Sequence, residues 1–209
     1  MTRVVSCFGA LAAGMMLAAP VAQAAPVDFQ LSPVTFISGS GYGADASEAG
    51  GTLLGVSFSA TVGAINFALN AVNDSFLFAF GSVTLDESGL INASETDNLG
   101  VAATFAFADP FAGLRNVIAS GSATVGLVGD PAIDLTIDWN PVDVSFGNGG
   151  AFRIEMNTLN FDSSGQTRTQ AARITLLAAP VPVPEPATLA LVAAALGGLA
   201  LSRRRPKSA

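Results

Sequence analysis

Acidic side chains are the residues of this sequence with the widest scope for chemistry. A pair of carboxylates can hydrolyse a glycosidic bond, one as general acid and the other as nucleophile or base. Carboxylates on loops can instead hold Ca²⁺, which takes oxygen ligands. The candidates lie in the middle of the chain: Asp86, Glu87, Glu95, Asp97, Asp130, Asp134, Asp138 and Asp143.

The spacing of Asp134 and Asp138 argues against hydrolysis. Both lie in an alternating run, so they would share one face of a strand, about 13 Å apart at about 3.3 Å per residue. Glycosidase carboxylates lie closer, at about 5 to 9.5 Å. A solvated polar face is the simpler interpretation. A carboxylate-based glycoside hydrolase stays open as the least favoured alternative.

Calcium is the second chemistry open to these acids. Three short segments carry suitable oxygens: Asp86-Glu87, Glu95-Thr96-Asp97 and Gly129-Asp130. None of them forms the D-x-D-x-D-G loop of an EF-hand. We therefore predict no cofactor and keep a structural Ca²⁺ as an alternative, since charged runs are usually just surface.

Several residue types that catalysis commonly uses are missing. The chain has no histidine, its one cysteine is Cys7, and its one lysine is Lys207. A Ser–His–Asp triad, a zinc cluster and a Schiff base in the central part of the chain are thereby excluded. The glycine run Gly39–Ala44 lacks the helix that a dinucleotide loop requires. The sequence predicts a protein that is not an enzyme.

Exposed aromatic rings would favour carbohydrate binding, and the sequence offers one tryptophan and one tyrosine. Trp139 is in phase with Ile133, Leu135 and Ile137, which predicts a core position. Tyr42 lies in the glycine-rich segment 38–51, where an exposed ring is expected. Either residue would mark the site of a carbohydrate-binding module.

Alternation of apolar and polar residues is the main structural signal. It recurs about every ten residues, with turn sequences between the runs and no helical stretch. This pattern predicts an all-β fold, an antiparallel β-sandwich or barrel. The expected strands are 55–62, 65–69, 75–88, 99–107, 117–129, 132–139, 142–146, 151–156 and 172–178.

The first 24 residues have the three parts of a secretory signal peptide. Arg3 is basic, residues 4–19 are apolar, and Ala22-Gln23-Ala24 is a cleavage signal that would leave Ala25 as the new N-terminus. Cys7 would leave with this peptide, so no disulfide is expected. The predicted extracellular β domain spans residues 25–179.

The segment 180–209 has a different composition. Alternating prolines hold the chain extended around Glu185. The apolar run 187–201 would span about 22 Å as a helix, short for a hydrocarbon core of about 30 Å. The basic tail 202–209 would stay in the cytoplasm by the positive-inside rule. Its bases are Arg203, Arg204, Arg205 and Lys207. We predict a transient anchor in the inner membrane.

Pro184, Glu185 and Pro186, then the apolar run, then the arginine cluster, resemble the PEP-CTERM sorting signal. The resemblance covers only this segment. It implies a protein exported across the inner membrane of a Gram-negative bacterium. It also implies that an exosortase, a membrane cysteine transpeptidase, removes the tail near the motif. Such proteins accompany exopolysaccharide production and biofilm formation.

The net negative charge of the β domain limits the classes of partner that it can bind. Residues 25–179 contain fifteen of the sixteen acidic residues and only four of the nine bases. Such a surface is a poor partner for nucleic acid. We predict a non-catalytic structural or adhesive protein at the cell surface or in the extracellular matrix. A carbohydrate- or calcium-binding module of that matrix, with exopolysaccharide as a partner, is the alternative.

Overall fold

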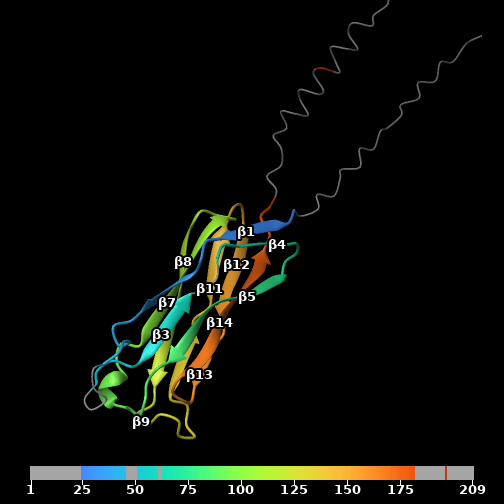
Figure 1. Ribbon diagram of the computed structural model, residues 1–209. Coiled ribbons are helices and arrows are strands. Elements are labelled where there is room, and N and C mark those ends of the chain that lie inside the picture. Colours follow the sequence, from blue (N-terminus) through green and yellow to red (C-terminus); the bar gives the residue numbers. More distant parts are fainter. Residues whose placement is uncertain (1–24, 46–50, 61–62, 182–195, 197–209) are drawn as a thin grey trace, which may run out of the picture.

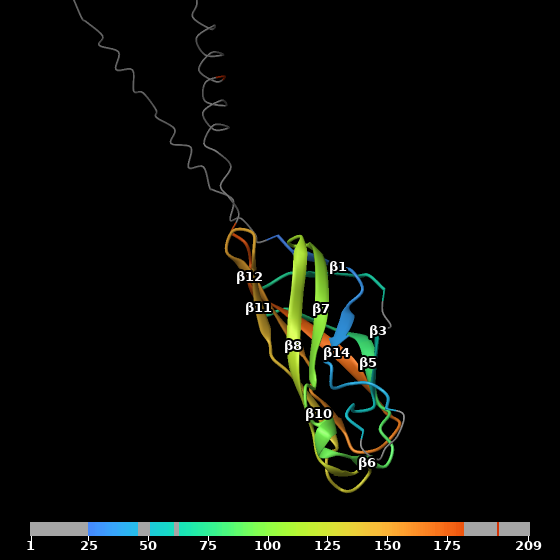
Figure 2. The same ribbon diagram turned by 90° about the vertical axis from the view of Figure 1, so that its left-hand side faces the viewer.

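The computed structural model describes residues 25–45, 51–60, 63–181 and 196. Two antiparallel sheets face each other and form an elongated sandwich (Figures 1 and 2). One short 3₁₀ turn, η1 (Ala93–Glu95), interrupts the strands of this described part. The predicted all-β class is therefore confirmed.

The larger sheet has the strand order β13-β10-β8-β7-β1-β4, and β2 also pairs with β7, beyond the end of β1. Its centre is the long hairpin of β7 and β8, which are paired from Gly100 opposite Ser120 to Phe107 opposite Gly113. The strands of this sheet are β1 (Val27–Leu31), β2 (Thr35–Ser38), β4 (Ile65–Leu69), β7 (Gly100–Asp109), β8 (Gly113–Ala123), β10 (Leu135–Trp139) and β13 (Leu159–Phe161).

The second sheet has the order β11-β12-β14-β5-β3. A small pair, β6 (Leu90–Ile91) with β9 (Gly126–Leu127), closes one end of the sandwich. The strands of the second sheet are β3 (Val56–Ala60), β5 (Ser75–Leu85), β11 (Val142–Phe146), β12 (Gly150–Met156) and β14 (Gln166–Ala178).

The core lies between the sheets and is rich in phenylalanine. Phe29 of β1 meets Phe152 of β12 edge to face at 5.2 Å between ring centroids, and Phe80 of β5 meets Phe105 of β7 at 5.7 Å. Both pairs join one sheet to the other. Because each aromatic ring buries a large apolar area, such pairs supply much of the cohesion of a fold without disulfides.

The sequence pattern did not predict every strand, and in one run it exchanged the buried and exposed positions. Strands β1, β2, β6 and β13 were not expected. Strand β8 begins four residues earlier than predicted, and β14 begins six residues earlier. The run 132–139 was expected to bury Ile133 and expose Asp134, but Ile133 is 48% exposed and Asp134 is buried. Strand β10 starts only at Leu135, so the two preceding residues follow the local turn rather than the strand alternation.

The predicted signal peptide and the predicted apolar segment 187–201 lie outside the described residues, apart from Leu196. Among the residues that are described, no helix has the length and apolar character needed to cross a membrane. The two chain ends of the sandwich lie at one end of it (Figures 1 and 2), and Ala25 and Val181 line one groove there. We call this end the terminal pole and the opposite end, which carries β6, β9 and η1, the distal pole.

Candidate functional site

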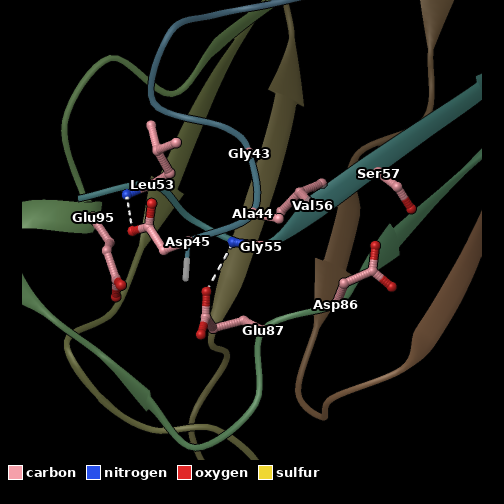
Figure 3. Close-up of a pocket in the computed structure, with 10 residues that line it drawn as sticks. All are labelled: Gly43, Ala44, Asp45, Leu53, Gly55, Val56, Ser57, Asp86, Glu87 and Glu95. Carbon is pink, nitrogen blue, oxygen red and sulfur yellow. Dashed lines mark hydrogen bonds between the residues drawn. The ribbon is translucent and has the colours of Figure 1, made fainter. Parts of the chain in front are cut away.

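A pocket of about 300 Å³ near the distal pole collects several of the acidic residues (Figure 3). It lies between the glycine-rich segment before β3 and the chain that follows β5. Its acidic side chains are Asp45, Asp86, Glu87 and Glu95. The structure thus brings together three acids that the sequence pointed to and adds Asp45. The one signal for Asp45 was its place in the glycine-rich segment.

Two of these carboxylates hold the glycine-rich segment in place. The Glu87 carboxylate accepts a hydrogen bond from the Gly55 N–H at 2.8 Å, and the Gly55 carbonyl accepts from the main chain of residues 86 and 87. Asp45 accepts from the N–H groups of Thr52 and Leu53 at 2.6 and 2.9 Å. The N–H groups of Thr52, Leu53 and Gly55 lie outside any strand ladder and need other acceptors, because buried main-chain donors are almost always paired. The two carboxylates provide these acceptors.

Glu95 is buried and closes the 3₁₀ turn. Its carboxylate accepts from the Asn92 N–H at 2.6 Å, while the Ser94 hydroxyl donates to the Gly51 carbonyl at 2.6 Å. A side chain at Gly51 would overlap the Glu95 carboxylate and would lie 2.8 Å from Asp45 Oδ2. Glycine leaves room for both carboxylates where the two loops meet, and the bond from Ser94 to Gly51 joins η1 to the glycine-rich segment.

The pocket does not assemble a metal centre within the described part of the chain. Nowhere among those residues do three or more Asp, Glu, His or Cys side chains converge on a point where an ion could be held. The other acids considered for calcium lie apart from this pocket, Asp97 on the exposed loop after η1 and Asp130 in the turn after β9. Three of the pocket carboxylates, those of Asp45, Glu87 and Glu95, act as acceptors for the main chain.

The remaining acids are separated from one another. Asp134 is buried and accepts from the Gly129 N–H at 3.0 Å, whereas Asp138 is exposed and accepts from the Thr158 hydroxyl at 2.7 Å. They do not share a face, so the expected geometry of this pair is wrong. Asp143 lies on the outer face of the second sheet, where Arg153 donates to both of its oxygens and lowers the pKa of the carboxyl.

Both aromatic candidates belong to the interior. Trp139 is buried as predicted, and its indole N–H donates to Gln170 at 3.0 Å. Tyr42 was expected to be exposed, but it is 9% exposed and its hydroxyl donates to the Leu99 carbonyl at 2.7 Å. Its ring packs on Phe58 at 5.1 Å. The glycine-rich segment folds onto the sandwich, and this contact removes Tyr42 from the surface.

The other feature that bears on function follows the sandwich in the sequence. Strand β14 ends at Ala178, and the Val181 N–H then donates to the Asn148 carbonyl at 2.8 Å, in the turn between β11 and β12. The chain continues from there into the proline-rich segment. Residues 182–205 match the family model described as the PEP-CTERM protein-sorting motif. The chain carries a PEP-CTERM sorting motif.

The PEP-CTERM match indicates export, a C-terminal sorting signal and processing by an exosortase. It covers the expected Pro184, Glu185 and Pro186, the apolar run and the three arginines, and it ends before Lys207. These residues, like the predicted cleavage signal at Ala22 and Ala24, lie outside the described part of the chain. No curated protein matches this chain, and no solved structure does. The family match therefore concerns residues 182–205 and gives no information on the β domain.

Proposed function

We propose that this chain is a non-catalytic structural or adhesive protein of a Gram-negative bacterial surface, sorted by an exosortase and retained in an exopolysaccharide or biofilm matrix. The observation that carries the proposal is the sorting motif, which follows the last residue of the sandwich directly. The N-terminal segment 1–24 acts as the signal peptide for export. The segment 187–201 holds the chain in the inner membrane until the tail is removed.

The non-catalytic part of the proposal rests on how the acidic residues are used. Asp45, Glu87, Glu95 and Asp134 each accept at least one hydrogen bond from a main-chain N–H group. A carboxylate in that role is held by the protein's own main chain, whereas a glycosidase acid must face the substrate to give it a proton. The pocket is then a structural junction.

A binding module is the second candidate, favoured by the position of the acid-lined pocket. The pocket lies near the distal pole, away from the end at which the tail leaves the sandwich (Figures 1 and 3). A domain tethered by its tail would present this pole to the matrix. Because the rings of Trp139 and Tyr42 are buried, such a module would recognise its ligand through polar groups.

Cell fractionation tests the proposal. The Glu185→Ala chain, or the wild type in a strain without the exosortase, should accumulate uncleaved in the inner membrane. Val183→Ala, just outside the Pro-Glu-Pro triplet, is the matched control and should be processed like the wild type. Unchanged processing and location in both the Glu185→Ala chain and the exosortase-deficient strain would contradict the sorting function. Retention of the mature protein by the host's own exopolysaccharide tests the matrix role.

A further inference from the structure

The terminal pole carries a groove of about 520 Å³. It is formed where the two ends of the described domain meet the turn between β7 and β8 and the turn between β11 and β12. Its lining combines apolar side chains with two exposed carboxylates, from Pro26, Pro110, Phe146, Pro180, Asp28 and Asp109. This groove has no part in the acid-lined pocket near the other pole.

The chain is fixed to this pole as far as Val181. Ala178 pairs with Ala151 at the end of the β12–β14 ladder. Beyond the ladder, the Val181 N–H donates to the Asn148 carbonyl at 2.8 Å, and the Asn148 side chain returns a longer bond to the Val181 carbonyl at 3.4 Å. Val181 is therefore a defined point from which the reach of the tail can be measured.

The sorting motif begins close to this point. Pro184 is the third residue after Val181. Three residues span at most about 10 to 11 Å even when fully extended. This is close to the distance of about 10 Å between the two sheets of a sandwich. Because this reach is short, a protein that binds Pro184–Glu185–Pro186 must also contact the terminal pole.

We propose that the terminal pole is a contact surface for the enzyme that processes the tail, an inference that rests on the proposed sorting function. The apolar groove fits an apolar projection of that enzyme, and Asp28 and Asp109 fit basic side chains beside it. Complementary charge of this kind governs the rate and register of docking. The two carboxylates disfavour an anionic lipid surface, so the partner is a protein rather than the membrane.

Charge reversal at the pole is the first arm of the test. The full-length chain carrying Asp28→Arg and Asp109→Arg is expressed in its exporting host, and pulse-chase labelling follows conversion of the uncleaved to the cleaved form. Processing should slow about ten-fold, because two attractions become repulsions. Asp97→Arg with Asp130→Arg makes the same change in charge at exposed acids near the distal pole, outside the acid-lined pocket, and should be processed at the wild-type rate.

A linker is the second part of the test. It distinguishes a lost contact with the enzyme from misfolding of the pole variant. Inserting about twelve Gly and Ser residues between Val181 and Pro182 moves the motif about 20 Å away on average. The pole variant should then be processed like the linker-bearing wild type. The contact is wrong if the pole variant is processed at the normal rate, if it is processed faster, as a membrane-facing pole would be, or if its defect survives the linker.

The same labelling distinguishes this inference from the sorting function. A blocked Glu185→Ala chain beside an unaffected pole variant would overturn the pole contact alone. Normal processing of both the Glu185→Ala chain and the wild type in the exosortase-deficient strain would overturn the sorting function and the contact with it.

Discussion

The Trp139 indole N–H donates to the Gln170 side-chain carbonyl at 3.0 Å and links the two sheets through the core. Trp139 belongs to β10 of the larger sheet and Gln170 to β14 of the second sheet. The Gln170 amide in turn donates to main-chain and side-chain oxygens of Asn157 at 3.1 and 2.9 Å. A fully buried glutamine thus provides the hydrogen-bond partner of the indole N–H in the one tryptophan of the chain. It also provides a donor to the oxygens of the loop between β12 and β13.

Gln170→Leu should therefore destabilise the domain. Leucine leaves the indole N–H and the Asn157 oxygens without these partners, and a buried polar group without a partner costs about 1 to 3 kcal/mol. Urea unfolding followed by the fluorescence of Trp139 measures the loss. Gln30→Leu, at an exposed position of β1, is the control and should change the free energy of unfolding little. Equal stability of the two variants would show that the buried glutamine contributes nothing.

The hydroxyl of Tyr42 makes the domain sensitive to alkaline pH. Burial raises the pKa of this phenol above its ordinary value of 10.0. The unfolded chain therefore loses the proton at a lower pH than the folded chain. Stability is complete below about pH 10 and falls above it, by up to about 1.4 kcal/mol per pH unit.

Tyr42→Phe should remove this dependence. The variant loses the hydrogen bond to Leu99, so it is less stable than the wild type near pH 8, but its stability should fall less between pH 9 and 11. Since Tyr42 is the single tyrosine, absorbance at about 295 nm follows its ionisation directly. A phenol that ionises near pH 10 in the folded protein would contradict its burial.

The wrong prediction that Tyr42 is exposed shows a limit of the sequence pattern. Alternation predicts burial only within a strand, and Tyr42 lies in a glycine-rich segment where no period applies. Its position depends on close approach to β8, where a Cβ at Gly121 would overlap the Tyr42 hydroxyl. The core strands were predictable because their pattern is local. The junction of Asp45, Glu87 and Glu95 was not, because it depends on hydrogen bonds across as many as 32 residues of sequence.

Gly121→Ala tests this close approach. The added methyl group would overlap both the Tyr42 hydroxyl and the Leu99 carbonyl, so the glycine-rich segment must move or the hydrogen bond must break. We expect a loss of about 1 to 3 kcal/mol in the free energy of unfolding. Gly63→Ala is the matched control, because nothing lies within 4 Å of a Cβ at that position. The argument fails if the two alanine variants are equally stable.

Glu95 should be required for the distal pole to stay ordered. Glu95→Ala removes the acceptor of the Asn92 N–H and leaves a space beside Gly51, at an expected cost of about 1 to 3 kcal/mol. Hydrogen exchange should rise at residues 51–55 and 92–96 and stay unchanged in β7 and β8, because the Glu95 carboxylate closes η1 and lies beside Gly51. Asp97→Ala, on the exposed loop after η1, is the control. Uniform exchange across the domain would contradict a local role.

Calcium should leave the stability of the domain unchanged. Asp45, Glu87 and Glu95 already accept main-chain hydrogen bonds, and in the described part of the chain no three acidic side chains converge on one point. An ion that bound only the folded state would raise the melting temperature as its concentration rose. Melting curves of the mature domain in millimolar calcium and in chelator should therefore superimpose. A higher melting temperature in calcium, lost in Glu87→Gln, would show instead that these carboxylates turn toward an ion and would favour the binding module over the structural role.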